Sequence, residues 1–301
     1  MSSLRTLRQG FRWGHPRALP ASAVPHLPAP TPSREPSTDW ARTPPARAVR
    51  SVVQAAGLAP LVRAEVRLTV SGLERLTALG DQPTVLVLNH NSHLDTAALL
   101  TALPPSLRAR TVVAAAADYF FASWWKAAGT ALAFGTVPIE RRGGAPSQTP
   151  ARLLREGWNV VVFPEGTRSP DGWTGRFRLG AAQLALDAGA PLVPVAVRGS
   201  WAAMPRGRSW PTPGRPHVSL VVGDPLRPRS DEDARALTAR AQAEVERLLD
   251  EDATDWWSSL RRAAAGDPPA LAAPAPTSWR RTWESSRPVK PRAPARRPVW
   301  R

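Results

Sequence analysis

The sequence contains no cysteine among its 301 residues. This absence excludes a disulfide bond, a thiolate nucleophile and a Cys-ligated metal site, and it leaves the redox state of the compartment open. Long hydrophobic runs are missing as well, because no stretch reaches the roughly 18 uninterrupted apolar residues of a membrane-spanning helix. Residues 1–20 lack the apolar segment of a secretory signal peptide, so we expect no such leader.

One apolar stretch, residues 111–135, approaches the length of a membrane segment, but Asp118 and Lys126 interrupt it. It contains a cluster of aromatic side chains, Tyr119, Phe120, Phe121, Trp124 and Trp125. Aromatic residues followed by Ala-rich sequence suit a helix that lies in the membrane interface. A buried core helix explains the pattern equally well, so both interpretations stay open.

Basic residues are concentrated towards the two ends of the chain, whose formal net charge is +16. Residues 1–50 hold eight Arg and two carboxylates, a net charge of +6, and residues 258–301 hold nine Arg, one Lys and two carboxylates, a net charge of +8. The middle of the chain carries only the remaining +2 and lacks the basic stripe that nucleic-acid binding needs. We expect the ends to contact an anionic membrane surface, unless they reflect only an Arg-rich bias of composition.

Composition divides the chain in the same places. Residues 1–50 and 258–301 are rich in Pro, Ala and Arg and contain no run able to bury a core, which predicts two disordered basic tails. Residues 51–257 are rich in periodic apolar residues, and a segment of this length suits one folded domain.

Strands and helices alternate through this predicted domain. Short apolar runs predict strands at residues 65–71, 84–88, 110–115, 133–139, 158–163, 191–198 and 217–222. Apolar residues at helical spacing predict helices at residues 51–63, 72–79, 96–103, 120–132, 149–156, 178–188 and 230–252. The order predicts an α/β fold with a largely parallel sheet flanked by helices. Functional side chains in such sheets usually lie in loops beyond the carboxyl ends of strands.

The loop that follows the strand at residues 84–88 reads Asn-His-Asn-Ser-His-Leu-Asp over residues 89–95. On a continuous helix His90 and Asp95 would face apart, but a break after His90 lets the carboxylate fold back onto the imidazole. A His oriented by a carboxylate is a common general base near neutral pH. Alternatively, Ser92 and Asp95 form a helix-capping box. A metal site built from His90, His93 and Asp95 matches no established zinc spacing.

Two more loops carry charged side chains after a predicted strand. One is Glu-Arg-Arg at residues 140–142, and the other is Phe-Pro-Glu-Gly-Thr-Arg-Ser at residues 163–169. Gly166 lets a ligand approach the backbone closely, and the planar guanidinium of Arg168 fits a phosphate group. Glu165 can hold Arg168 or accept a hydrogen bond from a substrate hydroxyl.

Taken together and in this order, these segments resemble the motif blocks of the lysophosphatidic acid acyltransferase family. Residues 89–95 resemble its His-x-x-x-x-Asp block, residues 135–141 its second block, residues 163–169 its Phe-Pro-Glu-Gly-Thr-Arg-Ser block, and residues 193–195 its fourth. The resemblance spans about Glu65 to Asp250. It implies a single acyltransferase domain that transfers a fatty acyl group from acyl-CoA or acyl carrier protein to the hydroxyl of a lysophospholipid. The first candidate acceptor is 1-acylglycerol-3-phosphate, which would give phosphatidic acid.

The resemblance also implies roles for single residues. His90 would be the general base and Asp95 the residue that orients it, whereas Pro194 would shape the pocket behind them. The acceptor-phosphate site would comprise Arg141, Glu165, Gly166, Thr167 and Arg168. No metal or other cofactor is implied, and the expected location is the cytoplasmic face of the cell membrane, with peripheral or monotopic attachment.

The residues available favour acyl transfer in one step, because the chain has neither a Cys nor a Gly-x-Ser-x-Gly nucleophile elbow. Backbone amides at the start of the helix after His90 are candidates for stabilising the oxyanion that develops. Three alternatives stay open. They are an acyltransferase for another lysolipid, a thioesterase or lipid hydrolase that uses the same His and Asp on water, and a noncatalytic basic protein that binds membranes.

Overall fold

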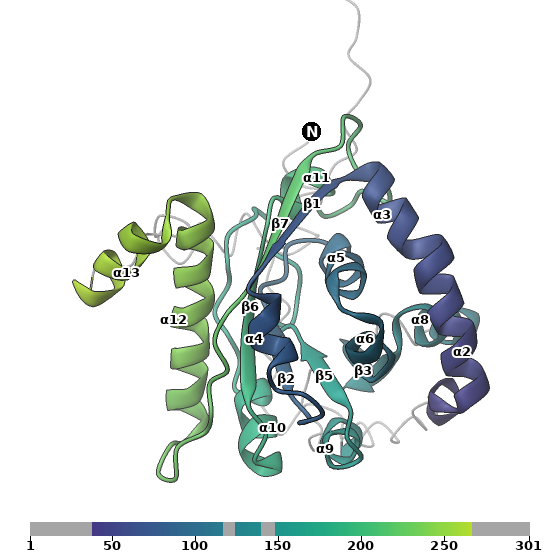
Figure 1. Ribbon diagram of the computed structural model, residues 1–301, viewed down its shortest axis with the longest axis horizontal. Helices are drawn as coiled ribbons and strands as arrows, with labels where there is room; N and C mark the ends of the chain where they lie inside the picture. Colours follow the sequence, from purple (N-terminus) through teal and green to yellow (C-terminus); the bar gives the residue numbers. More distant parts are fainter. Residues whose placement is uncertain (1–37, 117–123, 140–147, 267–301) are drawn as a thin grey trace, which may run out of the picture. The chain divides into compact units, whose positions relative to one another are not determined.

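The computed structural model describes residues 38–116, 124–139 and 148–266 (Figure 1). Its strands are β1 Arg67–Ser71, β2 Val85–Leu88, β3 Thr111–Ala116, β4 Thr136–Ile139, β5 Asn159–Val162, β6 Leu192–Arg198 and β7 His217–Val222. They form a seven-stranded sheet in the order β1-β7-β6-β2-β5-β3-β4. Every neighbouring pair in this described sheet is parallel except β6 and β7, which confirms the largely parallel α/β fold.

Helices precede, connect and follow these strands. Before β2 they are η2 Asp39–Arg42, α2 Pro44–Val52, η3 Val53–Leu58, α3 Ala59–Glu65 and α4 Leu73–Thr77. Between β2 and β5 they are α5 Leu94–Ala102, α6 Pro105–Ala109, α8 Trp124–Phe134 and α9 Gln148–Arg155. After β5 they are α10 Gly180–Ala188, α11 Ser200–Ala203, α12 Ala234–Ala253 and α13 Trp256–Ala264.

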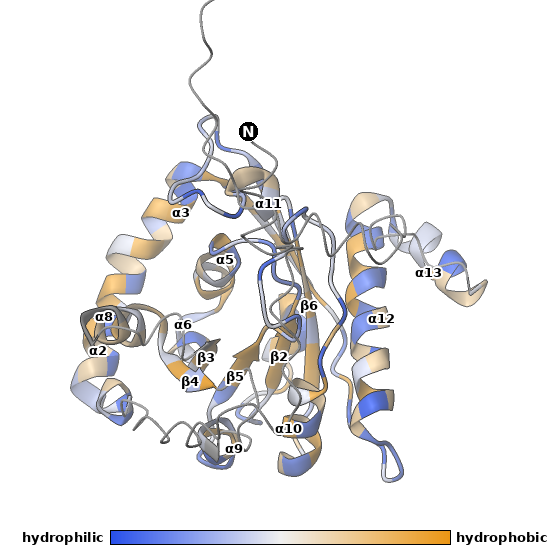
Figure 2. Ribbon diagram, turned by 180° about the vertical axis from the view of Figure 1, so that it is seen from behind, coloured by the Kyte–Doolittle hydropathy of each residue, from blue (hydrophilic) through white to orange (hydrophobic). Residues whose placement is uncertain are grey.

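Strand β2 explains why helices cover both faces of the sheet. Its four residues are all buried, with Val85 and Val87 in one apolar cluster and Leu86 and Leu88 in another. Helices α9, α10 and α12 contribute to the first cluster, and α3 and α5 contribute to the second, on the other side of the sheet (Figure 1). A strand covered on both faces has the continuous apolar sequence that β2 and β5 show in Figure 2, whereas α12 alternates between hydrophobic and hydrophilic colours.

Helical structure extends into the range that was predicted as a disordered tail, because η2 and α2 lie before residue 51. Arg50 is buried, and its Nη1 donates a hydrogen bond to the carbonyl oxygen of Ala41 at 3.1 Å. Gly135 leaves room for the guanidinium, since a Cβ at this position would lie 3.3 Å from Nη1. Residues 38–50 are therefore folded onto the domain, and a buried Arg supplies packing that apolar residues usually supply.

The helix predicted at residues 51–63 continues from α2 but contains η3, a segment of π-helix. Pro60 follows this segment and has no N–H group to donate to the preceding turn, so regular α-helical hydrogen bonding cannot run through it. A short π segment is a common adjustment inside an otherwise α-helical run.

Helix α13 likewise extends past residue 257, where the second disordered tail was predicted to begin. The carboxylate of Asp255 caps it by accepting a hydrogen bond from the N–H of Ser258 at 2.9 Å. An ion pair of 3.2 Å joins Arg262 to the buried Asp250 of α12. The cap and the ion pair explain why this segment is helical despite its few buried side chains.

Helix α8 lies in the apolar stretch that permitted two interpretations. Tyr119, Phe120 and Phe121 fall outside the described residues, and so do the side chains of Trp124 and Trp125. Further along the helix Ala127 and Ala131 are buried. The choice between an interfacial and a buried helix therefore stays untested for the aromatic residues.

Two glycines with positive φ allow a matched test of a close backbone approach. Gly199 follows β6 with φ +82°, and a Cβ there would lie 2.2 Å from the carbonyl oxygen of His217, whereas Gly189 has φ +59° and nothing within 4 Å. We expect Gly199→Ala to lower the free energy of unfolding by about 2–5 kcal/mol, from strain and overlap together. Gly189→Ala should cost about 1 kcal/mol, from strain alone. Urea unfolding measures both, and equal losses would contradict the expectation.

Candidate active site

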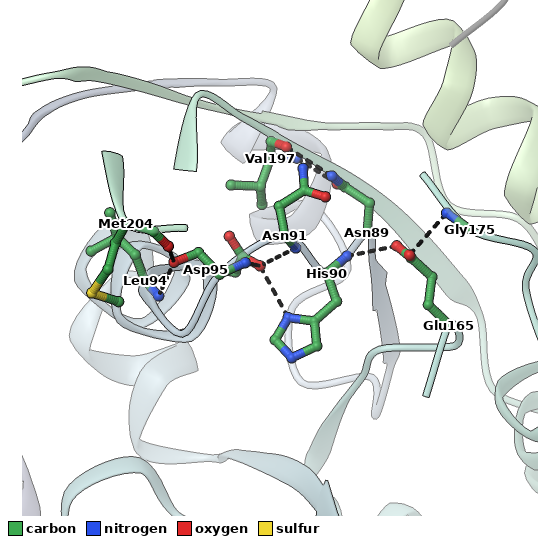
Figure 3. A network of polar contacts seen from close by, with 10 residues as sticks. Asn89, His90, Asn91, Leu94, Asp95, Glu165, Gly175, Val197 and Met204 are labelled. Carbon is green, nitrogen blue, oxygen red and sulfur yellow. Dashed lines mark hydrogen bonds and ion pairs between the residues drawn. The ribbon is translucent and has the colours of Figure 1, made fainter. Parts of the chain in front are cut away.

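The loop after β2 is joined to β6 by the side chain of Asn89, which is fully buried. Its Nδ2 donates to the carbonyl oxygen of Val197 at 2.8 Å, and its Oδ1 accepts from the N–H of Val197 at 2.8 Å (Figure 3). The carboxamide thus imitates the pairing of one more strand residue. It fixes the point at which the chain leaves the sheet, directly before His90.

His90 and Asp95 meet as the sequence predicts. The Nδ1 of His90 lies 3.0 Å from the Oδ2 of Asp95, whose side chain has no exposed surface. The same Oδ2 accepts the N–H groups of Asn91 and Ser92, each at 2.8 Å (Figure 3). One carboxylate therefore both holds the loop in the manner of a helix cap and orients the imidazole, so the two interpretations of this segment are compatible.

The loop after β5 holds His90 from the other side. The Oε1 of Glu165 accepts the N–H of His90 at 2.7 Å, and the N–H of Ser169 donates to the carbonyl oxygen of His90 at 2.7 Å. The ring of Phe163 stacks on the imidazole with a centroid distance of 4.0 Å. Backbone and ring are both fixed, which is the preorganisation that a general base requires.

Glu165 holds this loop through its carboxylate, and the substrate-binding role that the resemblance implies for it stays a prediction. Its Oε2 accepts the N–H of Gly175 at 2.9 Å, so both carboxylate oxygens bind backbone amides (Figure 3). The side chain is buried and is not among the described residues that line the adjacent cavity. Burial raises the pKa of Glu165 to about 7, although its two amide hydrogen bonds act in the opposite direction.

A cavity of about 420 Å³ lies beside His90. Its apolar lining comes from β3, β4, α8 and the loop after β5, with Val113, Ala114, Ala115, Phe134, Ile139 and Phe163. Its polar lining consists of Thr96, Thr130, Thr136, Thr167, His93, Arg168 and Arg206, and Gly166 lines it as well. The cavity can therefore receive a ligand that has both an apolar and an anionic part.

Three of the predicted substrate-binding residues, Gly166, Thr167 and Arg168, do line this cavity. Gly166 has φ +72°, and a Cβ there would lie 2.9 Å from the guanidinium carbon of Arg178, so no larger residue fits without a shift. Arg141 lies outside the described residues. Pro194 lies within β6 and is not among the described lining residues, so its expected role in shaping the pocket from behind stays a prediction.

His93 also lines the cavity, at the start of α5. Burial, and then the neighbouring charges of Arg168 and His90, lower the pKa of His93 to about 4. His93 is consequently neutral at physiological pH and adds no charge to the lining. Within the described parts of the chain, no group of three or more His, Asp or Glu side chains is placed to hold a metal ion.

Four of the amides near the start of α5, where candidate oxyanion donors were expected, donate hydrogen bonds within the loop. Asn91 and Ser92 donate to Asp95, Leu94 donates to the Oγ of Ser92 at 3.2 Å, and Asp95 donates to the carbonyl oxygen of Ser92 at 3.3 Å. These four N–H groups are used inside the loop, so any oxyanion donor from this helix start has to come from its other amides.

Arg206 is a cationic lining residue that the motif blocks do not include. It lies in the connection between β6 and β7, after the short helix α11. Its position after the carboxyl end of a central strand is the one signal that the sequence offers. That signal does not separate it from Arg208, two residues further on.

Known proteins are similar to this chain in sequence. A family model named Acyltransferase matches residues 67–198, which run from β1 to the end of β6. The chloroplastic 1-acyl-sn-glycerol-3-phosphate acyltransferase LPAT1 of Arabidopsis thaliana is 35% identical over 47% of this chain and 38% of its own length. The 1-acyl-sn-glycerol-3-phosphate acyltransferase alpha of Homo sapiens is 31% identical over 58% of this chain and 61% of its own length.

A solved structure agrees with the fold. The crystal structure of PlsC, the 1-acyl-sn-glycerophosphate (LPA) acyltransferase from Thermotoga maritima, superimposes with a TM-score of 0.56. It covers 73% of this chain and 85% of its own chain, with 23% sequence identity. At this identity the likeness establishes the fold alone. The matches span 38% and 61% of the two curated relatives' own lengths, so this chain is matched to only part of each.

The parallel sheet, the His–Asp loop at its carboxyl edge and the family match identify residues 67–198 as an acyltransferase domain. Within that class, the curated relatives are named 1-acyl-sn-glycerol-3-phosphate acyltransferases, which agrees with the resemblance drawn from the four motif blocks. The roles of the individual site residues stay predictions.

The raised pKa of Glu165 predicts a pH-dependent stability. Because its folded-state pKa of about 7 exceeds the ordinary value of 4.5, the folded protein binds the proton more tightly than the unfolded chain. This contribution to stability is full below pH 4.5 and is lost as the pH rises to 7. We expect the free energy of unfolding of wild type, minus that of Glu165→Gln, to fall by up to roughly 3 kcal/mol across this window.

Chemical unfolding of both proteins at several pH values measures this difference. The titration of His93, which has the opposite sign, is common to both proteins and cancels. A constant offset between them is expected from replacing an acceptor by an amide. A difference that does not change with pH would contradict the prediction.

Proposed function

We propose that this protein transfers a fatty acyl group from acyl-CoA or acyl carrier protein to the hydroxyl of a lysophospholipid. The preferred acceptor is 1-acylglycerol-3-phosphate, and the product is phosphatidic acid. The observation that carries this proposal is the oriented His90–Asp95 pair beside a cavity with an apolar and a cationic lining. The names of the curated relatives support the choice of acceptor.

His90 would act through its Nε2, because its Nδ1 faces Asp95. As the acceptor hydroxyl attacks the thioester carbonyl, Nε2 takes the hydroxyl proton and the buried carboxylate stabilises the imidazolium. The tetrahedral intermediate then collapses and the carbon–sulfur bond breaks. The leaving thiolate receives the proton from Nε2, which regenerates the neutral base for the next cycle.

A single transfer step fits the surroundings of Ser92 better than an acyl-enzyme. The Oγ of Ser92 donates a hydrogen bond to the carbonyl oxygen of Met204 at 2.7 Å and accepts one from the N–H of Leu94 at 3.2 Å. It is fully buried and is not among the described lining residues of the cavity. A hydroxyl engaged in this way is a structural link and not an activated nucleophile.

The two kinds of lining suggest how the substrates lie. An acyl chain would pack on Val113, Ala114 and Phe134, where transfer from water is favourable. A phosphate would lie near Arg168 and Thr167, which provide a planar guanidinium and a hydroxyl group. His90 lines the same cavity, so a hydroxyl between the phosphate and the chain would lie within reach of the base.

Attachment to the membrane surface is part of the proposal, with the cytoplasmic face as the expected side. No helix in the described residues is long and apolar enough to cross a membrane. Several apolar side chains on α2, η3 and α3 are 40–65% exposed, namely Val49, Val52, Val53 and Leu61. Exposed apolar residues on a helix, together with a net charge of +16, support peripheral or monotopic binding to anionic lipid.

Removal of the base tests the reaction. We expect His90→Ala to reduce radiolabelled transfer from palmitoyl- or oleoyl-CoA to lysophosphatidic acid by about 10²–10⁴-fold, because the hydroxyl loses its proton acceptor. His217→Ala is the control, since His217 is an exposed residue of β7 that contacts Thr69. It should retain activity within about twofold, as surface substitutions usually do.

The products separate the alternatives in the same assay. Full activity in a folded His90→Ala protein would refute the role of His90 as general base. Transfer to a different lysolipid alone would keep the mechanism and change the acceptor. Release of free fatty acid that does not depend on any acceptor would identify a thioesterase or lipid hydrolase.

Vesicle binding tests membrane attachment. We expect the full-length protein to cosediment with vesicles that contain phosphatidylglycerol and to bind pure phosphatidylcholine vesicles less. Raising the salt concentration from about 0.05 to 0.5 M should weaken the binding to phosphatidylglycerol, because salt screens charge. Binding that is equally strong on both lipids and in both salts would contradict the electrostatic part of the proposal.

A further inference from the structure

Arg206 is held at the cavity by contacts that tie its loop to the loop of His90. The buried hydrogen bond from Ser92 to the carbonyl oxygen of Met204, at 2.7 Å, anchors the chain two residues before Arg206. The N–H of Thr212 donates to the carbonyl oxygen of Ala203 at 2.7 Å, which closes the loop at its base. Arg206 is thus positioned by the same segment that carries the proposed base.

A tight turn places Arg206 at the tip of this loop. The N–H of Arg208 donates to the carbonyl oxygen of Pro205 at 3.1 Å, with Arg206 and Gly207 between them. Gly207 stands at the third position of the turn with φ +94°, a conformation that favours glycine. The side chain of Arg206 is exposed, and it lines the cavity while its neighbour Arg208 does not.

The charges around the cavity are of one sign. Arg168 and Arg206 line it, His93 is neutral, and no carboxylate is among the described lining residues. Within the described part of the chain, no carboxylate forms an ion pair with Arg206. By contrast, Arg240 and Arg247 of α12 pair with glutamates at 2.6 Å and 2.7 Å. A guanidinium that lines a cavity without an acidic partner is available to an anionic ligand.

We propose that Arg206 binds a phosphate group of one of the two substrates and is a second phosphate-binding cation of the cavity, beside Arg168. This inference rests on the proposed acyl transfer, in which both substrates carry phosphate. The acceptor would present a phosphate monoester, and the donor would present the phosphates of CoA or of the carrier's prosthetic group. A guanidinium forms paired, charge-assisted hydrogen bonds with either kind of phosphate.

The kinetic test compares Arg206→Gln with Arg206→Lys and with Arg208→Gln. Arg208 is the matched control because it is exposed in the same turn and bonds to Thr212 at 3.1 Å. We expect Arg206→Gln to raise the KM for one phosphate-bearing substrate about 10-fold or more, with kcat changed less than about twofold. Arg206→Lys should recover most of the loss because it keeps the charge, and Arg208→Gln should match wild type.

The substrate whose KM rises identifies the source of the phosphate. A rise for lysophosphatidic acid assigns Arg206 to the acceptor, and a rise for acyl-CoA assigns it to the donor. Unchanged KM values for both substrates would overturn the proposal. So would an equal rise in Arg208→Gln, which would indicate a general effect of positive charge.

Equilibrium binding separates this inference from the proposed function. Calorimetry with CoA, and with a lysophosphatidic acid analogue that lacks the sn-2 hydroxyl, requires no turnover. Arg206→Gln should bind one of them about 10-fold more weakly than wild type. If Arg206→Gln binds each ligand as tightly as wild type does, the role of Arg206 is refuted even if acyl transfer occurs. If Arg206→Gln binds one ligand more weakly but wild type transfers no acyl group, the role of Arg206 in binding is supported and the proposed reaction is refuted.

Discussion

The carboxylate of Asp95 is the group on which the rest of the site depends. It has no exposed surface, and its Oδ2 receives the N–H groups of Asn91 and Ser92 as well as the imidazole of His90. A buried carboxylate is costly unless donors approach it, and this loop conformation supplies three of them to one oxygen, Oδ2. The same conformation directs the imidazole of His90 towards the cavity. Stability of the loop and orientation of the imidazole therefore have the same cause.

The surrounding loops extend this constraint to distant parts of the chain. Glu165 and the N–H of Ser169 hold the backbone of His90, and Ser92 holds that of Met204. These contacts join the loops after β2, β5 and β6, which are neighbouring strands of the sheet. A parallel sheet places their carboxyl ends together, so residues far apart in sequence can share one hydrogen-bonded network. A shift in any one of these loops would move the imidazole.

The sequence predicted the strands and the His90–Asp95 contact well, for a physical reason. A strand buried on both faces, such as β2, has an apolar pattern that few other structures tolerate, and a loop at its end is easily located. The folded segment at residues 38–50 escaped prediction because Arg50 is buried there through a contact with Ala41 and the space above Gly135. Neither partner is visible from local pattern. The hydrogen bonds of Glu165 were likewise hidden, since its partners are the backbone amides of His90 and Gly175.

The carboxyl groups and the guanidinium groups of this site lie in different surroundings. Asp95 and Glu165 lie behind the loop and bind backbone amides, whereas Arg168 and Arg206 line the cavity. A carboxylate in the lining would repel a phosphate group, and an arginine behind the loop would offer no acceptor to its N–H groups. His93, held neutral by burial and by Arg168, can occupy the lining without opposing either substrate. The carboxyl groups of the site thus hold the loop that carries His90, and its guanidinium groups line the cavity.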